Sequence, residues 1–130
     1  MKYERISSEE LLKLEKEFID FLVVNGITAE DWVDIKLNKP QDSEEIILQF
    51  SDVVWESILR STTFLKKMES NKAFYFKCDK ENIAVKIVTK DDQLVKSASK
   101  KYSKTRELEM FDMIKNGCII SDGKSYKQLK

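Results

Sequence analysis

The chain has 130 residues and a mass of 15.2 kDa, which is the usual size of one domain and is long enough to bury a core without disulfides or metals. Apolar residues make up 42% and charged residues 35%, a composition that excludes general disorder. The charges balance overall, but residues 1–60 contain 7 Lys/Arg and 14 Asp/Glu, whereas residues 61–130 contain 16 and 9. This asymmetry predicts that the two halves attract each other across the fold, and the alternative is a basic binding face in the second half.

Cysteine content and hydropathy predict the cellular compartment. Two cysteines, Cys78 and Cys118, are too few for a disulfide scaffold, and residues 1–5 lack the apolar core of a signal peptide. The longest apolar stretch, residues 18–24, is interrupted by Asp20 and is far shorter than the ~20 residues of a membrane-spanning helix. We therefore expect one domain, residues 1–130, in the cytoplasm and without contact to a membrane.

The first helix is predicted to begin at Ser8, because Ser7 and Glu10 form an S-x-x-E capping box. Gly26 is expected to end it. Apolar residues at spacings of three and four predict a stripe that faces a core. The stripe contains Leu11, Leu14, Phe18, Phe21 and Leu22, and it is widened by Leu12, Ile19 and Val23.

Two further helices are predicted in the first half. Thr28 and Asp31 repeat the capping arrangement for a short helix that must end before Pro40. Asp42 or Ser43 is expected to cap a third helix that reaches Leu59. The apolar stripe of this third helix contains Ile46, Ile47, Phe50, Val53, Val54 and Ile58, with Trp55 as an optional member.

The second half changes from helical to extended patterns. Residues 61–68 fit either a helical turn or an extended segment, and we favour the helix. From Ala73 the apolar period becomes two, which predicts a β-hairpin with its turn at residues 79–82. The polar residues 91–103 indicate a loop or a marginal helix.

A last amphipathic helix is predicted to close at Asn116 and Gly117, followed by a short strand at residues 118–120 and a turn at residues 122–123. These elements predict an α+β fold. Three N-terminal helices would pack on a small antiparallel hairpin or sheet, and the further C-terminal helix would complete the core.

The sequence has no histidine and no glycine-rich phosphate loop, so it lacks the residues of the common nucleophile pairs, His-ligated metal sites and nucleotide sites. Carboxylates cluster at residues 30–34 and 44–52, where they fit solvated helix faces. We expect no catalytic residue, no metal and no cofactor. An enzyme built only on carboxylates and lysines is the alternative, and it would need a deep cleft.

Three segments carry a family resemblance: M-K-Y-x-R at residues 1–5, N-G-I-T-A-E-D-W at residues 25–32 and F-S-D-V-V-W-E at residues 50–56. Together they resemble a small, uncharacterised bacterial family with a domain of unknown function. The resemblance implies a bacterial cytosolic setting, and it brings no activity, cofactor or catalytic residue.

We expect a non-catalytic protein-interaction module, whose partner is another protein or a second copy of the chain. Trp residues are enriched at interfaces but also form cores. The candidate interaction residues, which could equally determine the fold, are Asp31, Trp32, Asp52, Trp55 and Glu56. The alternative function is weak, sequence-independent nucleic-acid binding through a basic segment. Its candidate residues are Lys96, Lys100, Lys101, Tyr102, Lys104 and Arg106.

Overall fold

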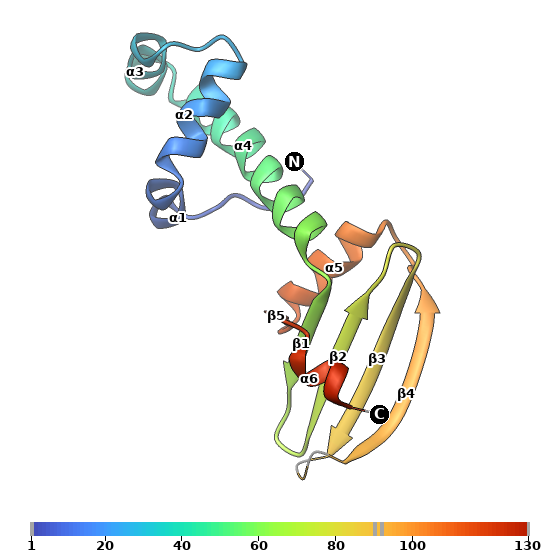
Figure 1. The fold of residues 1–130 in the computed structure, drawn as a ribbon. Coiled ribbons are helices and arrows are strands. Elements are labelled where there is room, and N and C mark those ends of the chain that lie inside the picture. Colours follow the sequence, from blue (N-terminus) through green and yellow to red (C-terminus); the bar gives the residue numbers. More distant parts are fainter. Residues whose placement is uncertain (1, 90, 92, 130) are drawn as a thin grey trace. The chain divides into compact units, whose positions relative to one another are not determined.

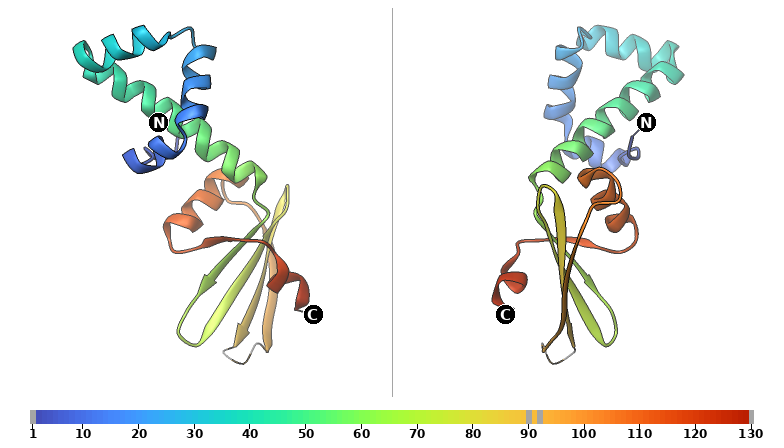
Figure 2. Two further views of the ribbon diagram at one scale, coloured as in Figure 1. Left: turned by 60° about the vertical axis from the view of Figure 1, so that its left-hand side comes forward. Right: turned by 90° about the vertical axis from the view of Figure 1, so that its right-hand side faces the viewer.

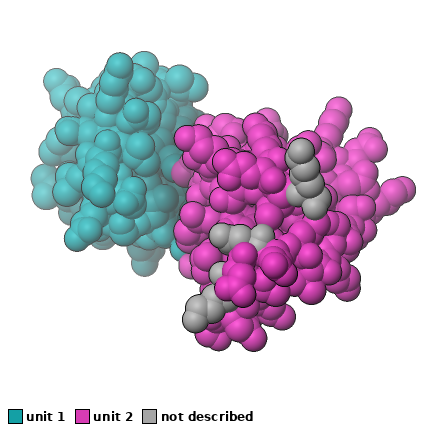
Figure 3. Space-filling model, turned by 60° about the horizontal axis from the view of Figure 1, so that its bottom comes forward, with its two compact units in different colours: residues 1–56 teal, residues 57–130 magenta. Residues whose placement is uncertain are grey.

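The computed structural model describes residues 2–89, 91 and 93–129, and it divides the chain into two compact units, Met1–Glu56 (unit 1) and Ser57–Lys130 (unit 2) (Figures 1 and 3). Helices lie in both halves and five antiparallel strands form one sheet, which confirms the α+β class. In chain order the elements are α1 (Ser8–Lys13), α2 (Glu15–Val24), α3 (Ala29–Asn38), α4 (Pro40–Ser61), β1 (Phe64–Met68), β2 (Lys72–Cys78), β3 (Asn82–Thr89), β4 (Leu94–Lys101), α5 (Arg106–Lys115), β5 (Ile119–Ser121) and α6 (Lys124–Gln128).

The first predicted helix begins and ends where expected, but it is two helices. Ser7 Oγ accepts the Glu10 N–H at 3.1 Å, and Leu14, with φ −103° and ψ 26°, separates α1 from α2. At the far end Gly26 has a φ of +74°, and the Ile27 N–H donates to the Leu22 carbonyl at 2.9 Å. This is the glycine-ended helix terminus that the sequence predicts.

The predicted apolar stripe is too wide. Phe18 and Leu22 are buried, whereas Leu12, Ile19 and Val23 are 74%, 50% and 67% exposed. A helix turns by about 100° per residue, so these three positions lie outside the sector that the neighbouring helices cover.

α3 has the full capping box between Thr28 and Asp31, but the predicted cap of the third helix is wrong. α4 begins at Pro40, before Asp42 and Ser43. Proline suits the first helical position, because its φ is already helical. A backbone N–H at this position has no acceptor within the helix, so the absence of one in proline removes no hydrogen bond. The helix then continues to Ser61, two residues beyond the predicted end.

The helices of unit 1 bury their stripes against one another. The ring of Phe18 lies 5.1 Å from that of Trp32 on α3 and 5.0 Å from that of Phe50 on α4, both edge-on. Such contacts add to the free energy gained by removing the rings from water. The buried members of this core are Ile6, Phe18, Leu22, Ile47 and Phe50.

Unit 2 contains the sheet, with strand order β4-β3-β2-β1-β5. The β2–β3 hairpin confirms the prediction. The helix favoured for residues 61–68 is wrong, because Phe64–Met68 forms the strand β1, which pairs with both β2 and β5. The loop or marginal helix expected at residues 91–103 is also wrong, because β4 pairs with β3 through most of this segment.

The sheet has a helix on each face (Figure 2). Directly opposed residues of antiparallel strands share a face, so Leu65, Phe76, Val85 and Ala98 form one row across β1 to β4. This face lies under α5, and we call it the α5 face. On the opposite face, the α6 face, Lys86 Nζ donates to the Tyr126 carbonyl of α6 at 2.9 Å and to the carbonyl of Leu129, the residue after α6, at 2.8 Å.

Candidate functional site

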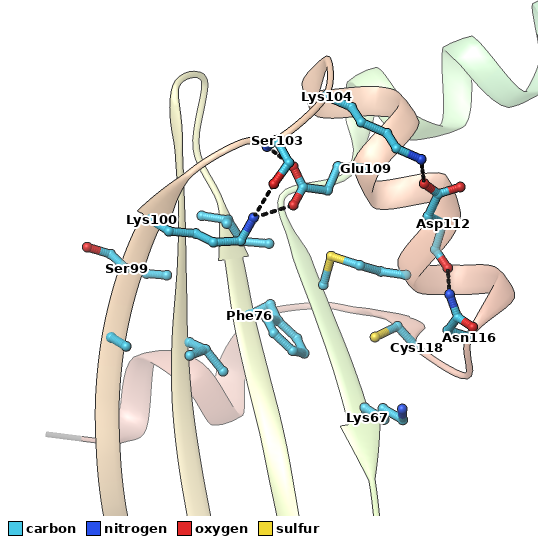
Figure 4. A pocket seen from close by; sticks show the side chains of 15 residues that line it. Lys67, Phe76, Ser99, Lys100, Ser103, Lys104, Glu109, Asp112, Asn116 and Cys118 are labelled. Atoms are coloured by element: carbon cyan, nitrogen blue, oxygen red, sulfur yellow. Dashed lines mark hydrogen bonds and ion pairs between the residues drawn. The ribbon is translucent and has the colours of Figure 1, made fainter.

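A groove of about 610 Å³ lies between α5 and the α5 face of the sheet (Figure 4). The sheet provides the floor, and α5 with the residues that precede it provides one wall. The lining residues are Lys67, Phe76, Ile83, Ala84, Val85, Ala98, Ser99, Lys100, Ser103, Lys104, Glu109, Asp112, Met113, Asn116 and Cys118.

The floor of the groove is apolar and becomes more open toward β4. In the row across the sheet, Leu65 on β1 is 1% exposed. Phe76 and Val85 are half-buried, and Ala98 on β4 is exposed. Residues of this kind line ligand pockets in other proteins, where polar groups at the rim fix the orientation of the ligand. The groove therefore offers an apolar surface that continues to the edge of the sheet.

A cluster of polar groups forms the rim where β4 leads into α5. Lys100 Nζ pairs with Glu109 and donates to Ser103 Oγ at 3.3 Å, and the Ser103 N–H donates to Glu109 Oε2 at 2.7 Å (Figure 4). Burial raises the pKa of Glu109, but these hydrogen bonds outweigh it and hold that pKa below its ordinary value. Glu109 is thus a charged, well-held carboxylate.

Two further lysines line the groove. Lys104 pairs with Asp112, and this hydrogen bond raises the pKa of Lys104. Lys67 makes no ion pair with any residue that the structure describes. Cys118 is buried, and burial raises the pKa of its thiol above the ordinary value. The nearby charge of Lys67 has the opposite effect but is the smaller of the two. The groove therefore contains an ammonium group without an ion pair in the described part of the chain, and the thiol that lines it is not activated.

β4 is the outermost strand beside this groove. Its inner side pairs with β3, and no strand among the described residues pairs with its outer side. All of its eight residues except Leu94 are exposed. Its outer backbone N–H and C=O groups could therefore accept a further strand.

The six nucleic-acid candidates have different contacts in the structure and do not form one basic surface. Lys100 and Lys104 are ion-paired, and the Tyr102 hydroxyl donates to the Asp79 carbonyl at 2.6 Å. Burial raises the pKa of Tyr102 to about 12. Lys96 and Lys101 are exposed on opposite faces of β4.

The sixth candidate, Arg106, is held inside unit 2. Its guanidinium donates to the carbonyls of Leu59, Thr62 and Cys78, with distances of 3.0 Å to Leu59 and Cys78. Its side chain is 14% exposed. An arginine in this position joins the end of α4 to β2 and has little surface left for a phosphate.

Three of the five interaction candidates in unit 1 contribute to its fold. Asp31 accepts the Thr28 N–H at 3.1 Å, and this hydrogen bond lowers its pKa. Trp32 packs on Phe18, and Trp55 is partly buried against the same core.

Asp52 and Glu56, the other two, join residues 1–5 to residues 50–56, two of the three segments that carry the family resemblance. Asp52 accepts the backbone N–H groups of Lys2 and Tyr3 at 2.7 and 2.8 Å. Glu56 accepts the Tyr3 hydroxyl and pairs with Lys2 Nζ at 3.1 Å. The N-terminal segment is therefore fixed to α4.

Cys78 also lacks the environment of a reactive thiol. It is 2% exposed, and burial raises its pKa to about 12, although the charge of Arg106 lowers it. In the part of the chain that the structure describes, no group of three His, Cys, Asp or Glu residues could hold a metal ion. Among the same residues, no helix has the length and apolar character needed to cross a membrane.

The sequence does not reveal the groove, because the lining residues come from β1 to β4, from α5 and from the segments on either side of α5, and they meet only when the sheet forms. One sequence signal was present: Lys96, Ala98 and Lys100 alternate with Ser97 and Ser99. This period of two is a weak strand signal, because a half-buried strand is recognised by apolar residues that alternate with polar ones, and this segment is mostly polar at both sets of positions.

Two overlapping segments of the chain, residues 1–96 and 85–130, match the model of one protein family, whose description is a family of unknown function (DUF6495). Together these segments span the whole sequence. No curated protein and no solved structure matches the chain.

Proposed function

The chain belongs to DUF6495, a family of unknown function, and we propose that it is a non-catalytic protein-interaction module that binds an extended segment of a partner along β4. The observation that carries this proposal is the open outer side of β4 beside an apolar groove. Strand addition to such an edge uses backbone hydrogen bonds for affinity and neighbouring pockets for specificity.

The two edges of the sheet differ in their capacity for such binding. β5 has three residues, whereas β4 has eight. A short edge strand offers few backbone groups, and it is one of the ways in which proteins avoid pairing with other chains. β4 is therefore the edge that supports the proposal.

The charge of β4 favours a different protein over a second copy of the chain. Lys96, Lys100 and Lys101 lie within six residues, so two copies of β4 would bring six ammonium groups together. Lysines on an edge strand discourage such pairing. A partner segment with acidic residues would instead be attracted.

The proposal that the chain is not an enzyme has separate support. The chain has no histidine, which is the usual acid–base group at neutral pH. Both of its thiols are buried with raised pKa values, so neither is activated as a nucleophile. We further propose that the protein is bacterial and cytoplasmic and needs no cofactor.

Nucleic-acid binding, the alternative, has less support. Of its six candidate residues, only Lys96 and Lys101 make no ion pair or side-chain hydrogen bond with described residues. Such binding would depend steeply on salt. A salt titration with labelled single-stranded DNA tests it, and the absence of salt-sensitive binding would contradict it.

Selection of random peptides on the immobilised full chain tests the proposed function. Hydrogen–deuterium exchange of the chain with an enriched peptide then locates the site. We expect slower exchange at the amides of residues 94–101. Enriched peptides that protect other segments, or a selection that enriches none, would contradict it. Light scattering after size-exclusion chromatography adds a check, because a dimer that persists at high salt would favour a second copy as the partner.

A further inference from the structure

We infer that the partner segment of β4 has the pattern acidic–x–large apolar–x–acidic, with its apolar side chain in the groove under α5. This inference rests on the proposed function and names the chemistry of the partner. It follows from which side chains β4 places on the α5 face, and from the charges and the open floor around them.

The register of the sheet fixes the faces of β4. Lys96, Ala98 and Lys100 oppose Ile87, Val85 and Ile83 on β3. The latter two line the groove, so these three residues of β4 lie on the α5 face. A strand added outside β4 would place every second side chain on the same face, directly beside these residues.

Ala98 leaves room for a side chain of the added strand to reach the groove. Its methyl group is the smallest side chain of β4 on the α5 face, and it lies in line with Val85 and Phe76. Both of these are half-buried, so part of their apolar surface still contacts water. A large apolar side chain opposite Ala98 would cover that surface, which favours binding.

Lys96 and Lys100, which lie on either side of Ala98 on the α5 face, favour acidic residues at the two partner positions opposite them. Opposite charges directly across two strands attract. Lys96 makes no ion pair with a described residue, so its ammonium group can attract an acidic partner residue directly. Lys100 already pairs with Glu109, so an acidic residue opposite it would share the ammonium group. The position opposite Lys96 should therefore contribute more.

The other face of β4 imposes a weaker requirement. Ser97 and Ser99 lie on the α6 face, followed by Lys101. The small hydroxyl side chains of serine are compatible with most polar side chains on an adjacent strand. The alternate positions of the partner are therefore left as x in the pattern.

Three synthetic peptides test the inference by fluorescence anisotropy with the full chain. The peptide TETFTET has the pattern, TTEFETT has the same composition but places Phe and Glu on opposite faces, and TETATET lacks the apolar side chain. We expect TETFTET to bind about tenfold more tightly than either control, since it alone combines both charge pairs with the apolar contact.

Two charge reversals on β4 provide a matched pair of variants. Lys96→Glu changes the α5 face, and we expect it to remove most of the preference for TETFTET over TTEFETT. Lys101→Glu makes the same change of charge on the α6 face. It should leave the preference for TETFTET in place, because the glutamates of that peptide lie on the α5 face, whereas those of TTEFETT would lie near residue 101 on the α6 face.

The outcomes separate this inference from the proposed function. Equal affinity for TETFTET and TTEFETT, with slower exchange of the amides of residues 94–101, would overturn the pattern and leave strand addition intact. Binding that protects other segments would overturn both. If none of the three peptides binds, the pattern is overturned, and the peptide selection alone decides the proposed function.

Discussion

The carboxylate of Asp52 on α4 holds Tyr3 of the N-terminal segment, because its Oδ1 accepts the Tyr3 N–H at 2.8 Å. Its Oδ2 accepts the neighbouring Lys2 N–H at 2.7 Å. Tyr3 is 7% exposed, and Ile6 farther along the segment is 8% exposed and donates its N–H to Ser51 Oγ at 3.0 Å. The segment before α1 is thus part of the core of unit 1.

Asp52→Ala should lower the free energy of unfolding by about 2 kcal/mol, since hydrogen bonds to a charged group contribute roughly 1.5–3 kcal/mol. Urea denaturation followed by tryptophan fluorescence measures this, because Trp32 and Trp55 both lie in unit 1. Glu45→Ala is the control: this carboxylate is exposed on the same helix, and its loss should leave the stability unchanged. Equal stabilities of the two variants would contradict the role of Asp52.

The helix boundaries of unit 1 could largely be predicted because their signals are local. The capping box of Thr28 and Asp31 and the positive φ of Gly26 depend on residues a few positions apart. The start of α4 at Pro40 was missed because Asp42 and Ser43 gave competing cap signals nearby. Most ends of these helices can thus be predicted from short stretches of sequence.

The sheet was only partly predictable, because the apolar patterns of β1 and β4 do not indicate extended structure. The apolar residues of β1, Phe64, Leu65 and Met68, have a helical spacing, yet β1 pairs on both sides with β2 and β5. β4 has little apolar alternation because one side of this edge strand meets solvent. Pairing with the hairpin overrides both local preferences.

The candidate site was less predictable than the fold. A cluster of basic residues in the sequence shows charge but not the partners of each charge. Arg106 donates to carbonyls from α4 and β2, whereas Lys96, ten residues earlier, faces solvent. Only tertiary contacts distinguish these roles, and the same contacts create the groove.

Arg106→Ala should destabilise unit 2 by roughly 3 kcal/mol, because the carbonyls of Leu59, Thr62 and Cys78 would each lose a donor. Arg106→Lys should recover only part of this loss, since one ammonium group cannot reproduce the planar fork. Urea denaturation followed by far-ultraviolet circular dichroism measures the change. Lys104→Ala, which removes an exposed ion pair, serves as the control and should have no measurable effect. An Arg106→Ala variant as stable as the unmodified chain would contradict this role.

The stability of the protein should fall above about pH 9. Burial raises the pKa of Cys78 from its ordinary value of 9.0 to about 12, so between these values the unfolded chain loses the thiol proton while the folded chain retains it. The unfolded state is then favoured, by about 1 kcal/mol between pH 9 and pH 10 for this thiol.

Urea denaturation at several alkaline pH values measures this effect. Cys78→Ala, compared with the unmodified chain at each pH, should show a shallower decline, because one of the buried thiols is then absent. Cys118, whose pKa is also raised by burial, would account for part of the remaining slope. Identical slopes in the two proteins would contradict the contribution of Cys78.

The prediction of a single domain concerns whether the two compact units unfold together. Both tryptophans lie in unit 1 and both cysteines in unit 2, so tryptophan fluorescence and pulse labelling of the thiols report on one unit each. α4 is one continuous helix from Pro40 to Ser61 and passes through the boundary, and helix formation is cooperative along the chain. We therefore expect the two probes to give the same urea midpoint. Separate midpoints would contradict a single domain, because each unit would then keep its structure without the other.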